Sequence, residues 1–366
     1  MYNNDRISLS KKGKVICPSC GRKTFVDYIY SDGTPVASGE CGKCDRADNC
    51  GVHIPPKQWF ADNRPLTGYD RRKNNSQPQR RIEEPKPSFI DKAVMFESIG
   101  HYDLNPLAIF LHRVFDGCAG ADVVDSILQR YAVGTSSKWG GATVYWQVDS
   151  LGNIRTAKVM GYDPITGKRN HSQNNWVHSL MADRYPDFNL RQCYFGAHVI
   201  KRADREAEAN NAEHQRLNIK GKFEPVIMLF EGEKAAIIMA IALKWGGAEN
   251  TFIPLSANGC GGFNPTLEAK RDRWNKLQAL KGRKVVLFPD NGKFAEWEAK
   301  AKLLKGFCKE VWISTACEPN LHPYAIDYEG TGYGFDDLIL QCVKEGKEPW
   351  DLITTCYGYH GQHRIV

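Results

Sequence analysis

One stretch decides the fold of this chain: Val226-Ile-Met-Leu-Phe-Glu-Gly-Glu-Lys-Ala-Ala-Ile-Ile-Met-Ala-Ile-Ala-Leu243. Its first five residues are apolar, which is typical of a buried strand, and the segment behind them has the length and propensity of a helix. Glu231 therefore stands at the carboxyl end of a strand. In open parallel α/β sheets ligands bind at this edge, because loops and helix N-termini converge there.

A second unit of strand, acid and helix follows. Lys284–Pro289 is an apolar run, Asp290 ends it, and Phe294–Leu304 has a helical pattern. If the two strands are neighbours in one sheet, Glu231 and Asp290 face each other across a crevice. Two carboxylates there suit a hard divalent cation such as Mg²⁺. The alternative is that both acids simply favour helix N-termini, where a negative charge meets the helix dipole.

Strands and helices alternate through the rest of this region. Phe252–Leu255 is a short strand after the first helix, and Glu310–Ser314 is another buried strand after the second. Asp336 and Asp337 then precede an apolar run and are expected at the start of a further helix. Alternation of this kind predicts an α/β domain with a Rossmann-like parallel sheet.

Phosphate-binding groups are expected beside the two acids. The loop Ser256–Gly262 is rich in glycine, and its backbone N–H groups, at Gly259 and Gly261, are candidates to cradle phosphates. Lys234, in the first turn of the helix after Glu231, is a further candidate. The alternative for Lys234 is an ordinary surface lysine.

Composition excludes several classes of protein. The chain has 366 residues, enough for two or three domains, and no apolar run approaches the roughly 18 residues that a membrane span needs. The N-terminal residues 1–6 lack the basic and apolar pattern of a signal peptide, so we expect a cytoplasmic protein without a membrane partner. A net charge of +7 permits nucleic-acid binding without requiring it.

Twelve cysteines in a cytoplasmic chain argue for metal binding rather than disulfide bonds. Cys17 and Cys20 form one Cys-x2-Cys pair and Cys41 and Cys44 a second, a spacing typical of a zinc ribbon. A closed site of four cysteines leaves no open position, so the expected zinc is structural. Five cysteines, including Cys50, lie in the first fifty residues, and we expect the seven scattered ones to be buried thiols: Cys118, Cys193, Cys260, Cys308, Cys317, Cys342 and Cys356.

The set of zinc ligands stays open on spacing alone. Cys50 and His53 follow the second pair closely, so the last two ligands are either Cys41 with Cys44 or Cys44 with Cys50. The segments 24–30 and 34–37 are expected to form the hairpin of the ribbon. Basic residues surround the cysteines, and nearby aromatic side chains are candidates for stacking on single-stranded bases or for a small core: Phe25, Tyr28, Tyr30, Trp59 and Phe60.

Between the ribbon and the parallel sheet we expect a linker and a mixed region. The segment 61–88 is polar, basic and proline-bearing, which is typical of a flexible linker. Helices are expected at 93–99, 106–115 and 123–130, a hairpin at 143–148 and 154–160, and an exposed helix or insertion at 201–222. Gly161–Arg169 resembles a Walker A loop but has the wrong glycine spacing and Arg169 in place of Ser or Thr, so a tight turn is expected.

Several of these motifs together resemble a known family. Leu229–Ala235, the glycine-bearing loop and Val285–Asp290 resemble a TOPRIM domain, the fold of bacterial primases, topoisomerases and some nucleases. A zinc ribbon ahead of TOPRIM resembles the primase arrangement, and a family of zinc-ribbon plus TOPRIM-like proteins on mobile elements of Bacteroides-type bacteria is closer still. That likeness runs over nearly the whole chain, at 44–53, 56–60, 145–149, 167–169, 176–178, 192–196 and 288–290.

The resemblance implies roles for single residues. Glu231 corresponds to the TOPRIM glutamate, a metal ligand or acid/base in nucleotidyl transfer, and Asp290 to the first acid of an Asp-x-Asp pair. Gly292 stands where the second acid belongs, and Ala235 where primases usually carry another aspartate. The candidates to complete the site are Glu233, Glu296, Asp336 and Asp337. Among these we predict Asp336 as the third magnesium ligand.

For the zinc ribbon, the resemblance favours Cys44 and Cys50 beside Cys17 and Cys20, with Cys41 as the alternate. Four parts are thus expected: a zinc ribbon at 1–60, a basic linker at 61–88, an α+β middle domain at 89–222 and a TOPRIM-like domain at 223–366.

The leading hypothesis is a primase-like replication or mobilisation protein. It would bind single-stranded DNA, hold structural Zn²⁺, and transfer nucleotides from triphosphates with Mg²⁺ or Mn²⁺ at the TOPRIM site. A helicase or a relaxase is a further candidate partner. Two alternatives remain: a non-catalytic nucleic-acid-binding protein with a degenerate TOPRIM domain, favoured by the missing acids, and a metal-dependent nuclease on the same fold.

Overall fold

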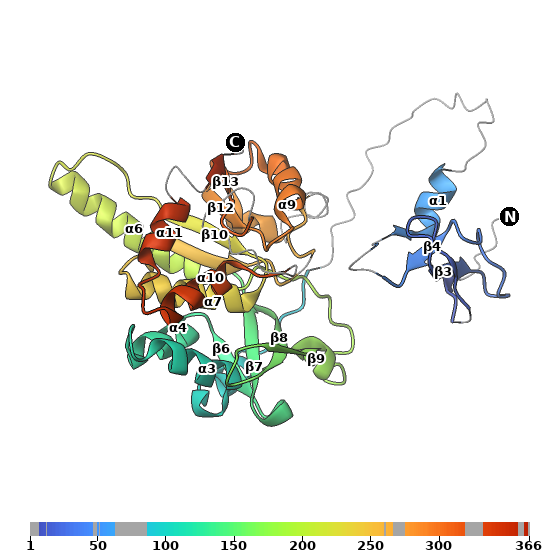
Figure 1. Cartoon of the computed structure of the whole chain (residues 1–366), viewed down its shortest axis with the longest axis horizontal. Helices are drawn as coiled ribbons and strands as arrows, with labels where there is room; N and C mark the ends of the chain where they lie inside the picture. The colour runs from blue at the N-terminus through green and yellow to red at the C-terminus, as the bar shows by residue number, and fades with distance from the viewer. Residues whose placement is uncertain are drawn as a thin grey trace. The chain divides into compact units, whose positions relative to one another are not determined.

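The computed structural model describes residues 7–11, 13–46, 50, 52–62, 86–259, 261–265, 275–318, 332–357 and 362–364. The chain divides into two compact units, Met1–Arg81 and Ile82–Val366, which carry the labels β1 to α1 and α2 to β14 (Figure 1). Each unit is described by itself below. Within the described residues, none of the helices has both the length and the apolar character required to cross a membrane.

The N-terminal unit is a small antiparallel sheet around a cysteine cluster. Its elements are β1 (Ser8–Leu9), β2 (Val15–Ile16), β3 (Lys23–Ile29), β4 (Gly42–Cys44), β5 (His53–Ile54) and helix α1 (Pro56–Asp62). Strand β3 pairs with β1, β2 and β4, and β5 extends the sheet from β4. Phe25 is fully buried against Cys17 and Cys44, so the cysteines form part of the core of this unit.

The expected hairpin of the ribbon forms, but its second segment is not a regular strand. The end of β3 pairs with the segment 34–37 through a bridge between Ile29 and Pro35, and the N–H groups of Tyr30 and Val36 donate across the pair at 2.9 and 2.8 Å. Proline has no N–H to donate to a ladder, which keeps this pairing short. Strand β4, which was not predicted, pairs with residues 25–27 of β3. Cys44, in contrast, enters the cysteine cluster and thereby fixes β4 beside β3.

The first part of the second unit is a four-stranded antiparallel sheet with helices. Its strands are β6 (Val133–Ser136), β7 (Ala142–Val148), β8 (Ile154–Tyr162) and β9 (Arg169–Trp176), in that order. Its helices are α2 (Lys92–Ser98), α3 (Pro106–Phe115), α4 (Ala121–Arg130) and α5 (Val177–Leu180), with 3-10 turns η1 (Tyr102–Leu104) and η2 (Lys138–Gly140). The predicted helices and the predicted hairpin of β7 and β8 are confirmed, with small differences at their ends.

A tight turn joins β8 to β9, as predicted when the Walker A interpretation was rejected. The Asp163 carboxylate accepts hydrogen bonds from the N–H groups of Ile165 and Thr166 at 2.9 and 2.7 Å. Gly167 closes the turn with a positive φ of 65°. Arg169 then begins β9.

The second part contains the parallel sheet. Its order is β11 (Phe252–Ser256), β10 (Val226–Phe230), β12 (Lys284–Phe288), β13 (Glu310–Ser314) and β14 (Gln362–Arg364). The first four strands are mutually parallel, which confirms the sequence prediction, and β14 adds an antiparallel edge. Its helices are α6 (Val199–Arg216), α7 (Glu233–Trp245), α9 (Phe294–Ala301), α10 (Phe335–Lys344) and α11 (Trp350–Tyr357), with 3-10 turns η3 (Lys276–Leu280) and η4 (Lys302–Leu304).

The two parts of this unit share one hydrophobic core. Helix α4 packs against α7, and Tyr145 on β7 stacks edge-on against Phe195, which forms a bridge with Ser256 at the edge of the parallel sheet. One continuous cluster of buried side chains runs from α3 and α4 through β10, α7, β12 and β13. Consequently β8 lies beside the N-terminal end of α7 (Figure 1).

Helix α6 is the exposed helix that the charged segment predicted. Only four of its residues are buried, all in its first half: Val199, Ile200, Ala203 and Ala207. Its C-terminal half extends away from the rest of this unit (Figure 1).

Candidate active site

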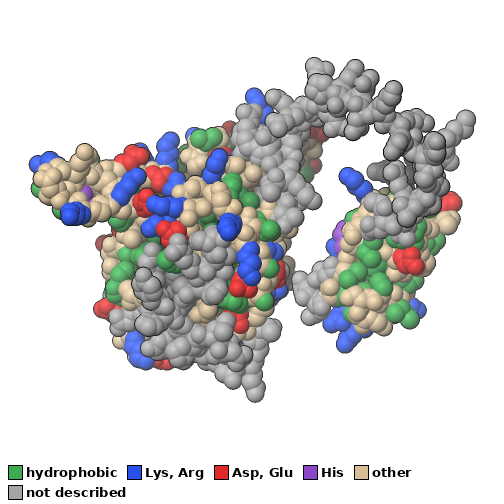
Figure 2. Space-filling view, turned by 90° about the horizontal axis from the view of Figure 1, so that it is seen from above, with side chains coloured by type: hydrophobic (Ala, Val, Ile, Leu, Met, Phe, Trp, Pro, Cys, Tyr) green, Lys and Arg blue, Asp and Glu red, His purple; other side chains and the backbone are tan. Residues whose placement is uncertain are grey.

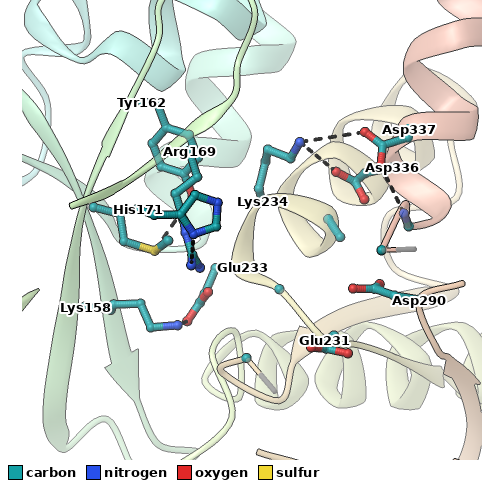
Figure 3. A pocket seen from close by; sticks show the side chains of 16 residues that line it. Lys158, Tyr162, Arg169, His171, Glu231, Glu233, Lys234, Asp290, Asp336 and Asp337 are labelled. Atoms are coloured by element: carbon teal, nitrogen blue, oxygen red, sulfur yellow. Dashed lines mark hydrogen bonds and ion pairs between the residues drawn. The ribbon is translucent and has the colours of Figure 1, made fainter. Parts of the chain in front are cut away.

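A pocket of about 340 Å³ opens where β10 and β12 end. Its walls come from the start of α7, the start of α10 and the β8–β9 hairpin (Figure 3). The lining residues that carry charge or a polar ring are Lys158, Tyr162, Arg169, His171, Glu231, Glu233, Lys234, Asp290, Asp336 and Asp337. The pocket therefore has the position expected for a ligand site in a parallel α/β sheet.

The register of the sheet places the two predicted acids at this pocket. Phe230 and Phe288 are paired at the ends of β10 and β12, with ring centroids 4.7 Å apart. Glu231 follows the first strand directly, and Asp290 lies two residues beyond the second. Both side chains line the pocket, so the structure brings together the two residues that the sequence singled out.

Helix α10 adds two more carboxylates. Asp336 and Asp337 stand in its first turn and line the same pocket. A Cβ atom placed on Gly334 would lie 2.7 Å from Asp336 Oδ1 and 2.9 Å from Asp290 Oδ1. Asp290 and Asp336 therefore approach one point from two elements, with only a glycine backbone between them.

Crowding of these acids changes their proton affinity. Burial, followed by the negative charges of Glu231, Asp336 and Asp337, raises the pKa of Asp290 to about 8. Burial also raises the pKa of Glu231 and that of Asp337. Carboxylates forced together in this way are stabilised in their charged form by a cation, and oxygen ligands of this kind fit Mg²⁺ or Mn²⁺.

Lys234 already contributes one positive charge. Its Nζ lies 3.0 Å from Asp336 Oδ2 and 4.0 Å from Asp337 Oδ1. Burial opposes the charged ammonium, but the two carboxylates outweigh this effect and raise the pKa of Lys234. Lys234 is therefore not an ordinary surface lysine, because its side chain is only 24% exposed and is paired with a carboxylate.

The opposite wall of the pocket is basic and comes from the β8–β9 hairpin. Lys158 Nζ forms a buried ion pair with Glu233 Oε1 at 2.8 Å and a hydrogen bond with the carbonyl oxygen of Asn258 at 3.1 Å. Arg169 and His171 lie on β9, with Nη2 and Nδ1 2.9 Å apart. These three residues were missed in the sequence, because only the packing of β8 beside α7 brings them to the pocket. The one sequence signal was the stretch 167–169, which carries the family likeness.

The glycine-rich loop contributes less than expected. Gly259 lines the pocket, but its N–H donates to the carbonyl oxygen of Glu231 at 2.8 Å. This N–H group is therefore engaged in holding the loop against the end of β10. Gly261 is not among the residues that line the pocket.

The four acids that could complete the site separate into two groups. Asp336 and Asp337 lie on the acidic wall, whereas Glu233 is held by Lys158. Glu296 lies on α9 outside the pocket lining and pairs with Lys300 at 2.6 Å. The acidic wall thus consists of Glu231, Asp290, Asp336 and Asp337.

In the N-terminal unit, four sulfurs converge. The Sγ atoms of Cys17, Cys20, Cys44 and Cys50 all lie within 4.8 Å of one another. Cys17 and Cys50 are 3.6 Å apart and Cys20 and Cys44 4.0 Å apart, close to the roughly 3.8 Å between sulfurs around a tetrahedral zinc ion. This donor set and geometry fit a structural zinc ion.

Thiolate formation is favoured at one of these ligands. The backbone N–H of Arg22, assisted by the Thr24 hydroxyl, lowers the pKa of Cys20 to about 6. Cys41 is fully buried outside the cluster, where burial and then the charge of Asp27 raise its pKa.

The aromatic side chains near the cysteines, which were candidates for base stacking or for a small core, have different environments. Phe25 is core, whereas Phe60 is 42% exposed. Tyr28 stacks on His53, and the Trp59 indole N–H donates to Glu40 at 3.3 Å. Of the predicted linker, residues 63–85 lie outside the described residues, whereas its first two residues belong to α1 (Pro56–Asp62).

The expectation that the scattered cysteines are buried holds for Cys193, Cys308 and Cys317. It was wrong for Cys118, which is exposed just beyond α3, and Cys342 is half-buried. Cys260 lies outside the described residues, as does the side chain of Cys356.

Comparisons with known proteins identify the N-terminal unit. Residues 5–65 match a family model described as a zinc beta-ribbon finger, in agreement with the cysteine cluster. Residues 105–210, which include β6 to β9, match a domain of unknown function, DUF6371. A comparison with curated proteins finds no matching sequence.

Several solved structures of primases are similar to this chain, with low TM-scores and low sequence identity. The Escherichia coli primase catalytic core has a TM-score of 0.39 and 12% identity, covering 75% of this chain and 79% of that one. A DnaG primase catalytic domain bound to single-stranded DNA gives 0.37 and 13%, covering 71% and 75%. The Aquifex aeolicus primase, with zinc-binding and RNA polymerase domains, gives 0.30 and 16%, covering 93% and 78%. At these TM-scores the likeness carries no argument about activity.

Proposed function

We propose that this chain is a primase-like nucleotidyltransferase that acts on single-stranded DNA. The observation that carries the proposal is the convergence of four carboxylates from β10, β12 and α10 in one pocket, opposite Lys158, Arg169 and the ring of His171 from β8 and β9. Acids on one wall and bases on the other suit a substrate with phosphates and a divalent cation. The resemblance of this region to TOPRIM supports the same reaction.

The acidic wall would hold the cation. Glu231 and Asp290 are the proposed catalytic ligands, with Asp336 as a further carboxylate beside Asp290. A Mg²⁺ or Mn²⁺ ion bound there would neutralise phosphate charge and lower the pKa of an attacking hydroxyl. The raised pKa of Asp290 supports this assignment, because a bound cation would offset both the burial and the repulsion that raise it.

The basic wall would bind the triphosphate. Arg169 and His171 face the pocket from β9, and Lys158 stands beside them on β8 (Figure 3). Guanidinium groups bind phosphate oxygens in a bidentate manner, which orients the nucleotide. In this proposal the N–H of Gly259 is a secondary feature, since it is already hydrogen-bonded.

The zinc ribbon would engage the template strand. Lys and Arg side chains lie on its surface (Figure 2), and those described are Lys11, Lys14, Arg22, Lys23, Lys43, Arg46 and Lys57. Exposed Phe60 and half-buried Tyr28 and Tyr30 offer rings for base stacking. Binding of this kind depends on ionic strength and tolerates many sequences.

Primer synthesis on single-stranded DNA tests the proposal. Labelled nucleotide triphosphates are supplied with Mg²⁺ or Mn²⁺, and wild type is compared with Glu231→Gln and Asp290→Asn. Glu208→Gln is the matched control, because Glu208 is exposed on α6 and does not line the pocket. We expect short products from wild type and the control, and none from the two pocket variants.

The same assay separates the alternatives. Shortening of a labelled template that requires Glu231 and Asp290 would establish a nuclease instead. No product and no cleavage, with DNA binding unchanged in both variants, would leave a non-catalytic binding protein. The observation that favours this last outcome is the loss of two acids, at Gly292 and Ala235.

A further inference from the structure

Glu233 and Lys234 are consecutive residues in the first turn of α7, and their side chains reach opposite walls of the pocket (Figure 3). Glu233 pairs with Lys158 on β8, whereas Lys234 pairs with Asp336 on α10. Neighbouring residues of a helix point about 100° apart, so one turn contacts both walls. The Lys234 ammonium is thereby directed into the acidic wall.

The position of this ammonium is that of a bridging cation. Its Nζ stands 3.0 Å from Asp336 and 4.0 Å from Asp337, and the Asp336 side chain is only 7% exposed. An exposed ion pair contributes little and exchanges readily with solvent, but a pair with a buried carboxylate is held in place. Lys234 is therefore a fixed positive charge at this end of the acidic wall.

The lysines at the other end of the acidic wall belong to a different carboxylate. Lys293 and Lys300, whose charges act on Glu231, lie 3.6 and 2.6 Å from Glu296 on α9. Two-metal sites hold two cations about 4 Å apart and use carboxylates to ligate both. Here Glu231 and Asp290 are available to a cation. Asp336 and Asp337 already lie beside the Lys234 ammonium.

We infer that Lys234 is a built-in counter-ion, and that the pocket binds a single divalent cation, on Glu231 and Asp290, rather than two. This inference rests on the proposed function, since it concerns the cation of that site. The second positive charge of a two-metal centre is supplied by the chain itself, from α7. Gly292, in place of an acid beyond Asp290, agrees with a site that holds one ion.

Counting bound Mn²⁺ tests the inference without reference to activity. Full-length protein with zinc in its ribbon is titrated with Mn²⁺, and free Mn²⁺ is measured by electron paramagnetic resonance. We expect one Mn²⁺ per wild-type chain and two in Lys234→Met, where the second pair of acids loses its ammonium. Two ions in the variant should also show a spectrum broadened by coupling between neighbouring Mn²⁺ ions.

Two control variants test whether the positive charge at position 234 determines the number of bound Mn²⁺ ions. Lys234→Arg keeps the charge and should bind one Mn²⁺. Lys244→Met removes another lysine of the same helix, one that pairs with Glu249 at 3.7 Å outside the pocket, and should also bind one. If Lys234→Met does not fold, as judged by circular dichroism, Lys234→Gln removes the same charge and replaces it in the experiment.

Two bound Mn²⁺ ions in wild type would overturn the inference, and so would one ion in a folded Lys234→Met or Lys234→Gln protein. Absence of bound Mn²⁺ in wild type would overturn both the inference and the proposed function. One ion in wild type, two in the variant and no primer synthesis would uphold the inference and reject the proposed polymerisation.

Discussion

Asp290 lies among like charges, and its environment has a consequence for stability. Its pKa of about 8 in the folded protein, against an ordinary value of 3.8, means that the folded state binds a proton more tightly than the unfolded state. The resulting stability is complete below pH 4 and is lost as the pH rises toward 8. Each tenfold difference in proton affinity corresponds to about 1.4 kcal/mol, so the loss amounts to a few kcal/mol.

We therefore predict that Asp290→Asn stabilises the protein at pH 8 in the absence of Mg²⁺. The free energy of unfolding from urea titrations should decrease from pH 5 to pH 8 in wild type and change less in the variant. Addition of Mg²⁺ should stabilise wild type more than the variant, because the cation binds the charged carboxylate. An Asp290→Asn protein that is less stable than wild type at pH 8 would contradict this account.

A substitution at Gly334 provides a steric test of the acidic wall. Its φ of −112° is open to any residue, so the effect of Gly334→Ala comes from the new Cβ atom, which would meet Asp336 and Asp290 at 2.7 and 2.9 Å. We predict about tenfold weaker Mn²⁺ binding, equivalent to about 1.4 kcal/mol, with a small change in melting temperature. Gly117→Ala, where a Cβ meets nothing within 4 Å, should bind Mn²⁺ as wild type does. Equal Mn²⁺ affinity in the two variants would show that the Asp290 carboxylate beside Gly334 does not hold the ion.

The sequence predicted single residues well where one strand determines their position. Glu231 and Asp290 each follow an apolar run, so their place at the sheet edge could be derived locally. Lys158 and Arg169 could not be found in this way. Strands β8 and β9 have the pattern of an ordinary hairpin, and helix α7, which packs beside them, begins 57 residues after β9 ends, a separation that no local pattern encodes.

At the scale of elements, the ion pair between β8 and α7 joins two parts of the unit. Lys158 and Glu233 have side chains 7% and 4% exposed. Removal of one partner leaves a buried charge without compensation, which typically costs about 3 to 5 kcal/mol. Replacement of both by apolar side chains of similar size removes the charges together and costs much less.

We predict that Lys158→Met lowers the free energy of unfolding by about 3 kcal/mol, and that Lys158→Met combined with Glu233→Met recovers much of it. Urea unfolding of both single variants and the double variant measures the coupling. Additive losses in the double variant would mean that the two side chains do not form the pair described here.

Sequence patterns were sufficient to predict some helices and strands and not others. The parallel sheet was predictable, because alternating apolar strands and helices leave few other arrangements. The pairing of β3 with β4 in the ribbon was not, because β4 has only three residues and its place is fixed by Cys44 in the cysteine cluster. The antiparallel edge strand β14 is also short and gave no pattern in advance.

At the scale of the whole molecule, the chain consists of two compact units with separate sources of stability. The ribbon unit has a core of few residues, and small domains of this kind depend on their metal. The second unit has an extensive apolar core that contains no part of the zinc site. We therefore expect zinc loss to unfold the first unit alone.

Cys44→Ser and Cys41→Ser test this division as a matched pair. Both cysteines are fully buried at the ends of the same short segment, but only Cys44 belongs to the cluster. Cys44→Ser should lose zinc, measured by atomic emission, and lose DNA binding, while the main thermal transition of the second unit is retained. Zinc loss in Cys41→Ser with retention in Cys44→Ser would show that the ligand set is different.

The most direct test of the central claim is the location of the cation. In a crystal structure of the full-length protein with Mn²⁺, the anomalous signal of manganese locates the ion. This test does not depend on activity. The account predicts an anomalous peak about 2.1 to 2.2 Å from carboxylate oxygens of both Glu231 and Asp290, with the Lys234 ammonium still on Asp336. An empty acidic wall at saturating Mn²⁺, or an ion bound only elsewhere, would contradict it.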